Sequence, residues 1–226
     1  MVAKWRSLQL RPRLNLFSFF ACVKLGVVIL AAGASSRMGK PKMLLPWGAT
    51  TVLGHLVEQW KRLGANHLAV VYSGADNAVP GELDRLNFPS HDRIINPAPA
   101  SGMFSSIQRA AQWTGWKPGL THWVIVLGDQ PHLRRATLQK LIDFSGDHPQ
   151  AVCQPSRAGR PRHPVVLPAE IFRELKDSIE ENLKKFLQHA SIPVALCELD
   201  DPGLDLDIDH PADYEKAVQL FAAEPG

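Results

Sequence analysis

Residues 24–42 read KLGVVILAAGASSRMGKPK, an apolar run that passes directly into small residues and a glycine. A continuous apolar, β-branched run is typical of a strand that is buried on both faces of a parallel sheet. Three cations, Arg37, Lys40 and Lys42, follow shortly after it, and no acidic residue balances them. The stretch therefore predicts a buried strand that leads into a positively charged loop.

This loop is suited to a polyphosphate ligand. Its small residues Ala31, Ala32 and Gly33 allow a nucleotide to approach the main chain closely. Arg37 and Lys42 can then neutralise phosphate oxygens through charge-assisted hydrogen bonds. The patterns GxGxxG and GxxxxGK[ST] are absent, so the loop is neither a dinucleotide fingerprint nor a Walker loop. The alternative is an ordinary glycine turn with solvated cations.

Strand-like and helix-like segments alternate along the rest of the chain. We expect strands at residues 24–31, 67–74, 92–96, 121–131, 150–156, 163–168, 193–199 and 203–209. We expect helices at residues 51–64, 101–115 and 134–146, two more between 168 and 190, and a last helix from Pro211, with 76–90 forming a short helix or loop. This alternation indicates the α/β class, with one mainly parallel sheet covered by helices on both faces.

A second chemically unusual segment follows the strand-like run WVIVL. It reads GDQP, residues 128–131, and it should lie at the same edge of the sheet as loop 31–42, where ligands bind in such folds. The oxygens of Asp129 at that edge suit a Mg²⁺ ion that also holds substrate phosphates. The alternative role for Asp129 is an Asx turn or a helix cap.

Acidic residues also alternate near the C-terminus, in the sequence DLDID. With a strand period of two, Asp205, Asp207 and Asp209 fall on one face. Three like charges on one face repel one another, so a cation nearby would relieve the strain. For Asp205 we expect a solvated acidic edge instead.

Composition narrows the class of protein. The chain has 226 residues, of which 45% are apolar and 21% charged, as in a soluble globular protein. Cys22, Cys153 and Cys197 show no metal-ligand or disulfide spacing, which favours a reducing cytoplasm. The net charge of +3 argues against a nucleic-acid partner, although no acidic residue precedes Glu58 and the positive charge is concentrated around the glycine loop.

Residues 1–22 combine a basic start with a short apolar run. No A-x-A-like cleavage site precedes Lys24, and the run is too short for a bilayer span, which takes about 20 residues. We expect a disordered extension or a start-site artefact, no stable membrane insertion, and one domain over residues 23–226. The alternative is a membrane-surface or targeting role.

The motifs together resemble those of a known family. The stretches VVILAAGASSRMGKPKMLLPW, NPAPASGMFSSI, VLGDQPHL, GRPRHPVVLP and DLDIDHPADYEKA occur in the order and spacing of the MobA-like nucleotidyltransferases. They are most similar to the molybdenum cofactor cytidylyltransferases. The resemblance covers the chain from about Lys24 to its end. It implies a three-layer α/β/α sandwich with a Rossmann-like sheet of the nucleotide-diphospho-sugar transferase type.

The resemblance also implies roles for individual residues. A nucleoside triphosphate would contact Leu30, Ala31, Ala32, Gly33, Arg37, Lys42, Gly102 and Ser106. Mg²⁺ would be held by Asp129 with Asp209 or Asp207, and His163 would lie toward the acceptor. Arg37, Lys42 and Asp129 would be the catalytic residues.

The activity that the resemblance implies is transfer of CMP from CTP to a molybdopterin phosphate, with release of pyrophosphate. ATP or GTP as donor and a sugar phosphate or alcohol phosphate as acceptor are alternatives, and so is a non-catalytic cofactor chaperone for a molybdoenzyme. Two departures concern the acceptor side. Arg162 replaces the glycine of the family's usual Arg-Gly-His-Pro, and a glycine- and aspartate-containing turn is replaced by EENLKK, residues 180–185, which we expect to be helical.

Overall fold

The first predicted strand, β1 (Leu25–Leu30), lies inside an eight-stranded sheet, and all six of its residues are buried. In the computed structural model, residues 23–189 and 193–222 are described, so the expectation for residues 1–22 lies outside the described residues. The strand order is β10-β7-β9-β6-β1-β4-β5, with β8 paired to β7. The other strands are β4 (His67–Ser73), β5 (Arg93–Asn96), β6 (His122–Leu127), β7 (Val152–Arg157), β8 (Arg160–Pro161), β9 (Val165–Pro168) and β10 (Val194–Glu198).

The sheet is mainly parallel. Strand β1 pairs in parallel with β4 and β6, β4 with β5, and β10 with β7. Strand β9 runs antiparallel to β6 and β7, because only the short β8 hairpin separates it from β7 in the chain. A separate small hairpin joins β2 (Pro46–Trp47) to β3 (Thr50–Thr51).

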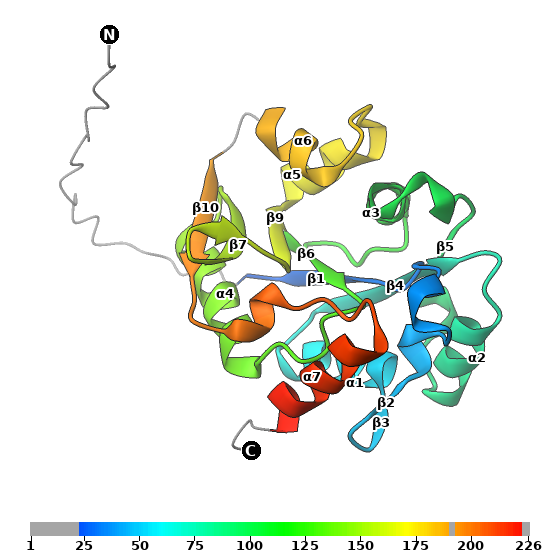
Figure 1. Cartoon of the computed structure of the whole chain (residues 1–226). Coiled ribbons are helices and arrows are strands. Elements are labelled where there is room, and N and C mark those ends of the chain that lie inside the picture. The colour runs from blue at the N-terminus through cyan, green and yellow to red at the C-terminus, as the bar shows by residue number, and fades with distance from the viewer. Residues whose placement is uncertain (1–22, 190–192, 223–226) are drawn as a thin grey trace, which may run out of the picture.

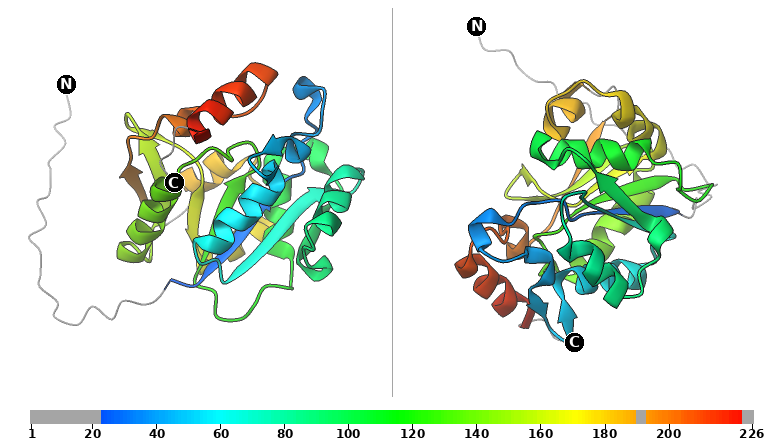
Figure 2. Two further views of the ribbon diagram at one scale, coloured as in Figure 1. Left: turned by 90° about the horizontal axis from the view of Figure 1, so that it is seen from below. Right: turned by 90° about the vertical axis from the view of Figure 1, so that its right-hand side faces the viewer.

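Helices cover both faces of this sheet (Figures 1 and 2). One face carries α3 (Met103–Gln112), α5 (Ala169–Glu174) and α6 (Leu183–His189), and the other carries α1 (Val52–Arg62), α2 (Ala78–Arg85), α4 (Arg135–Asp147) and α7 (Pro211–Ala222). Successive residues of β1 point to opposite faces of the sheet. Val27 packs in the hydrophobic core on the α1 side, and Val28 packs in the core on the α3 side. The expected three-layer α/β/α sandwich is confirmed.

Two local expectations are wrong. Residues 203–209 do not form a strand: a 3-10 helix covers Pro202–Asp205, and irregular backbone follows it. The Asp201 side chain accepts a hydrogen bond from the amide of Gly203 over 2.8 Å, which stabilises that turn. The segment EENLKK is helical only from Leu183 onward, because the Asn182 side chain caps the helix by accepting from the amide of Lys185.

Within the described ranges, no helix has both the length and the apolar character that a membrane span requires.

Candidate functional site

Two loops begin side by side at the carboxyl edge of the sheet. Strands β1 and β6 are parallel neighbours with Leu30 in register with Leu127, so the loops that follow them start at the same level. The amide of Gly128 donates to the carbonyl of Leu30 over 3.1 Å. A Cβ atom at position 128 would lie 2.6 Å from that carbonyl oxygen, so the approach requires glycine. Gly128 thereby holds Asp129 against loop 31–42.

Loop 31–42 is curled by its own side chains. Ser35 adopts the left-handed conformation with a φ of 51°. Its hydroxyl oxygen accepts a hydrogen bond from the backbone amide of Lys42 over 3.0 Å. This contact closes the loop and turns Lys42 back toward the carboxylates at the edge of the sheet.

Four charged side chains meet beside this loop. The ammonium of Lys42 lies 3.5 Å from Asp129 Oδ2 and 3.3 Å from Asp209 Oδ1. Arg37 Nη1 donates to Asp209 Oδ2 over 2.8 Å. The Lys42 side chain is only 14% exposed, so its ion pairs are shielded from solvent more than surface pairs are. The structure thus brings Arg37, Lys42, Asp129 and Asp209 together.

Asp129 is held in an unfavourable environment for a charge. Burial raises the pKa of its carboxyl above the ordinary value, the Lys42 ammonium opposes this shift, and the nearby Asp207 carboxylate adds to it. Its Oδ1 atom is buried and has no hydrogen-bond partner among the described residues. A buried carboxylate oxygen without a partner fits a ligand that supplies positive charge.

The C-terminal acidic segment joins this site through its backbone. The amide of Ile208 donates to the carbonyl of Asp129 over 3.0 Å, which places Asp207 and Asp209 on either side of that contact. Asp207 Oδ1 accepts from Gln130 Nε2 over 2.8 Å. Gln130 was not among the predicted site residues, although its position next to Asp129 was a signal that could have found it.

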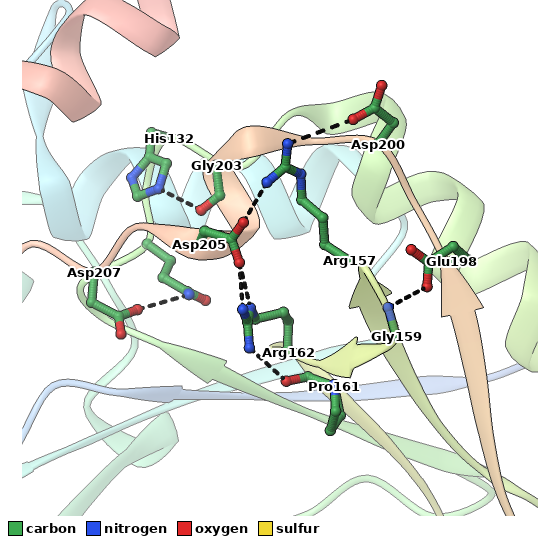
Figure 3. A network of polar contacts seen from close by, with 11 residues as sticks. His132, Arg157, Gly159, Pro161, Arg162, Glu198, Asp200, Gly203, Asp205 and Asp207 are labelled. Atoms are coloured by element: carbon green, nitrogen blue, oxygen red, sulfur yellow. Dashed lines mark hydrogen bonds and ion pairs between the residues drawn. The ribbon is translucent and has the colours of Figure 1, made fainter.

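Asp205 does not form the solvated acidic edge that we expected. Arg157 and Arg162 both bind its carboxylate, as Figure 3 shows, and their hydrogen bonds, that of Arg162 first, lower the pKa of Asp205. The three aspartates therefore have three different sets of partners. The reason is that the backbone leaves extended geometry at 202–205, so the period of two does not apply.

A cavity of about 330 Å³ opens above Asp129. Its lining includes six of the predicted residues, namely Leu30, Ala32, Gly33, Gly102, Ser106 and Asp129. It shares Ala32 and Gly33 with an adjoining hollow of about 850 Å³. A smaller one, of about 190 Å³, is lined by Gly33, Arg37, Lys42 and Asp209, among others. Most of the predicted nucleotide and metal residues thus line these neighbouring spaces.

Three predicted residues, Ala31, Asp207 and His163, line none of these spaces. The Ala31 side chain is buried in the core, and its amide donates to the carbonyl of Val71 over 2.8 Å. Ala31 therefore anchors the start of the loop to the sheet. His163 is half-buried, and its Nδ1 atom lacks a partner within the described part of the chain. Burial lowers the pKa of His163 to about 4, with the Asp207 carboxylate opposing the shift, so the imidazole is neutral at pH 7.

Other polar residues hold the cavity walls in place. Asn96, which ends β5, donates through Nδ2 to the hydroxyls of Ser105 and Ser106, each over 2.9 Å. Its Oδ1 accepts from the amide of Ala98 over 2.9 Å. Asn96 therefore fixes the start of α3 at the cavity. In the sequence, the position of Asn96 at the end of a predicted strand was the only feature that could have identified it.

The arrangement can hold a divalent cation only with help from a ligand. Within residues 23–189 and 193–222, no group of three or more His, Cys, Asp or Glu side chains is arranged to hold a metal ion. The unpartnered oxygen of Asp129 and the adjacent Asp207 carboxylate fit a Mg²⁺ ion that takes its remaining ligands from phosphates and water. The donor set therefore suits a metal that arrives with a polyphosphate.

Known proteins are similar to this chain over most of its length. Residues 27–194 match the family model described as the MobA-like NTP transferase domain. The chain is 27% identical over 201 residues to the molybdenum cofactor cytidylyltransferase of Escherichia coli K12, spanning 86% of this chain and 95% of that protein. It is 28% identical over 206 residues to the molybdenum cofactor guanylyltransferase of Mesorhizobium japonicum, spanning 86% and 94%.

A solved structure with similar coverage is that of Rv0371c from Mycobacterium tuberculosis. It has a TM-score of 0.69 and 27% sequence identity, and the match covers 87% of this chain and 98% of that one. The same mycobacterial protein has also been solved in complex with manganese, with a TM-score of 0.64. The resemblance expected from the sequence motifs is confirmed over most of the chain.

Proposed function

Because the chain belongs to the MobA-like NTP transferase family, we propose that it transfers CMP from CTP to the phosphate of a molybdopterin-type acceptor and releases pyrophosphate. One observation carries the proposal. Arg37, Lys42, Asp129 and Asp209 meet beside a cavity whose floor is the glycine loop. Such a site combines close backbone approach with paired positive and negative charge, as a metal-bound triphosphate requires.

The reaction needs no nucleophile from the protein. An oxygen of the acceptor phosphate, already an anion at neutral pH, forms a bond to the α-phosphorus of the nucleotide, and the bond from that phosphorus to the bridging β-phosphate oxygen breaks. The chain has to align the two phosphates and neutralise the charge that collects on the departing pyrophosphate. Lys42 and Arg37 are the residues in place to do so.

Asp209 is the carboxylate partner that Arg37 and Lys42 share. Its two oxygens accept from Arg37 and Lys42 respectively. A triphosphate that enters the loop offers oxygens with the same geometry and more charge. We expect Arg37 and Lys42 to exchange Asp209 for phosphate oxygens on binding.

Asp129 and Asp207 would hold Mg²⁺, the metal expected from the sequence. Mg²⁺ there would neutralise negative charge on the phosphates. The manganese complex of the mycobacterial relative supports a divalent cation in this fold. Asp209 is the alternative second ligand, and it would become available once Arg37 and Lys42 turn to phosphate.

CTP is the proposed donor because two loop positions differ from the guanylyl-transferring relatives. The family resemblance implies, in guanylyl-transferring members, a second glycine at the position of Ala32 and an Asp-Lys pair at the positions of Pro41 and Lys42. His163, neutral and close to Asp207, is the proposed contact to the acceptor. A cytoplasmic location and a molybdoenzyme that receives the product stay predictions.

A pyrophosphate-release assay that crosses four nucleoside triphosphates with a panel of phosphorylated acceptors tests the proposal. We expect release only with CTP, Mg²⁺ and a molybdopterin phosphate together. If pyrophosphate is released only with a sugar phosphate as acceptor, the proposed acceptor is wrong but the proposed nucleotidyl transfer stands. No release with any pair, from protein that still binds CTP, would favour a cofactor-handling chaperone over an enzyme.

A further inference from the structure

Asp205 lies between two arginines that come from a different part of the fold (Figure 3). Arg162 Nε donates to Asp205 Oδ1 over 2.8 Å, and Arg157 Nη1 donates to Asp205 Oδ2. Each carboxylate oxygen is therefore held by a separate guanidinium. We call Arg157, Asp205 and Arg162 the arginine clamp.

The arginine side of the clamp is anchored in the sheet. Arg157 is the last residue of β7, and it pairs with Arg160 of β8. The amide of Arg162 donates to the carbonyl of Pro155 over 2.7 Å, so the backbone on both sides of the hairpin is fixed by ladder-type contacts. The guanidiniums thus project from a rigid support.

The aspartate side has no such support. Residues 206–209 have no strand or helix pairing, although the Ile208 side chain is buried in the core. Upstream of it, His132 Nε2 donates to the carbonyl of Gly203 over 3.0 Å, and Asp201 accepts from Thr137 Oγ1 over 2.7 Å. On the downstream side, Asp207 Oδ1 accepts from Gln130 Nε2, and the amide of Ile208 donates to the carbonyl of Asp129. The clamp fixes the upstream side, at Asp205, and so limits the positions that Asp207 can take.

The clamp is poorly suited to a purely stabilising role. The side chains of Arg157, Arg162 and Asp205 are 35%, 26% and 36% exposed, and ion pairs this accessible to solvent add little to the free energy of folding. A pair of guanidiniums on one carboxylate does, however, restrict its position strongly. Position, more than stability, is what the clamp supplies.

We propose that Arg157 and Arg162 are positioning residues that, by holding Asp205, set Asp207 in place beside Asp129 for a divalent cation. The inference rests on the proposed function, because it concerns the cation site of that function. It also gives a role to Arg162, which stands where the family usually has glycine. Groups that orient metal ligands from behind commonly change metal affinity by about 10-fold to 100-fold when they are removed.

The test measures Mn²⁺ binding to the full-length protein by electron paramagnetic resonance, with and without CTP, against a protein-free Mn²⁺–CTP reference. The variants are Asp205→Asn, the double variant Arg157→Ala/Arg162→Ala, and the triple combination. Arg160→Ala is the matched control, because Arg160 is an exposed cation of the same hairpin. Melting temperatures are measured for all of them, and binding is measured well below the lowest one.

We expect Asp205→Asn and the double arginine variant each to weaken Mn²⁺ binding by about 10-fold. The triple variant should be no weaker than either, because all three changes break the same contact. At saturating metal, the KM for CTP should stay within about twofold of the wild-type value, since the clamp does not touch the nucleotide loop. Arg160→Ala should bind Mn²⁺ as the wild-type protein does.

Four results would overturn the inference. Wild-type Mn²⁺ affinity in Asp205→Asn would do so, as would additive losses in the triple variant, or an equal loss in Arg160→Ala, which would indicate a general effect of charge. Absence of Mn²⁺ binding by the wild-type protein would also contradict it. By contrast, normal Mn²⁺ behaviour without pyrophosphate release in any assay would refute the proposed function and leave the clamp standing.

Discussion

The amide of Ile208 donates a hydrogen bond to the carbonyl of Asp129 over 3.0 Å. This contact joins the loop after β6 to the irregular segment before α7, and it brings carboxylates from two distant parts of the chain to one place. Lys42, from a third part, completes the meeting by pairing with both Asp129 and Asp209.

Replacing Lys42 by alanine should lower kcat/KM by about two to four orders of magnitude, because the lost ammonium would neutralise charge that grows as pyrophosphate departs. Lys61→Ala, on the exposed end of α1, is the control and should leave kcat/KM unchanged. Lys61→Ala should melt like the wild-type protein, and Lys42→Ala should still fold. Wild-type turnover in Lys42→Ala would refute the assignment of this loop to the triphosphate.

Two glycines at the site should respond to alanine in opposite ways. A Cβ at Gly128 would lie 2.6 Å from the carbonyl oxygen of Leu30, so Gly128→Ala should lower the melting temperature by several degrees. A Cβ at Gly33 meets no atom within 4 Å, so Gly33→Ala should melt normally. It should nevertheless bind CTP at least about 10-fold more weakly, because the methyl group would occupy space at the nucleotide cavity.

Calorimetry and CTP titration together check this pair. A Gly33→Ala variant with wild-type CTP affinity would place the nucleotide elsewhere. A Gly128→Ala variant with an unchanged melting temperature would mean that the two loops can separate without cost.

The fold was predictable where local sequence and tertiary structure agree. Apolar runs such as that of β1 can satisfy their burial only inside a sheet, and the small and charged residues after them mark the edge where ligands bind. That Lys42 and Asp129 lie close together could be predicted because each follows a buried strand. If the two strands are parallel, the loops after them lie at the same edge of the sheet.

The acidic segment was not predictable in the same way. Its alternation of aspartate with leucine and isoleucine is typical of a strand, but Asp201 and Gly203 form a local turn that takes the backbone out of extended geometry. The partner of Asp205 is likewise decided by arginines more than forty positions earlier in the chain. Periodicity carries no information about contacts of that kind.

Replacing Asp129 by asparagine should abolish turnover and, without metal, leave the protein at least as stable as the wild type at neutral pH. Burial raises the pKa of Asp129, so the folded chain binds this proton more tightly than the unfolded chain does. The charged carboxylate therefore costs free energy of folding at neutral pH. That cost disappears as the pH falls below the ordinary aspartate pKa of about 4.

Melting temperatures of Asp129→Asn and wild type, measured with a chelator across this pH range, check the sign. The difference should favour the variant at neutral pH and shrink on acidification, whereas the exposed control Asp147→Asn should show no comparable trend. A variant that melts lower at neutral pH would mean that the ion pair with Lys42 outweighs the cost of burial.

The last prediction separates Asp207 from Asp209. If Asp207 holds the metal, Asp207→Asn should raise the Mg²⁺ concentration for half-maximal rate by about 10-fold or more, because an amide oxygen cannot replace carboxylate charge on a hard cation.

Asp209→Asn should instead change the affinity for CTP in the absence of metal. Both oxygens of Asp209 are occupied by Arg37 and Lys42, so the carboxylate competes with an entering triphosphate for the same two cations. Removing its charge should therefore strengthen CTP binding in the absence of metal by a few-fold, whereas Asp207→Asn should leave that affinity nearly unchanged. Calorimetric CTP titration with a chelator present measures this effect without any contribution from turnover.

Weaker metal-free CTP binding by Asp209→Asn would show that Asp209 orients Arg37 and Lys42 for the triphosphate instead of competing with it. A raised Mg²⁺ requirement in Asp209→Asn but not in Asp207→Asn would transfer the second metal position to Asp209.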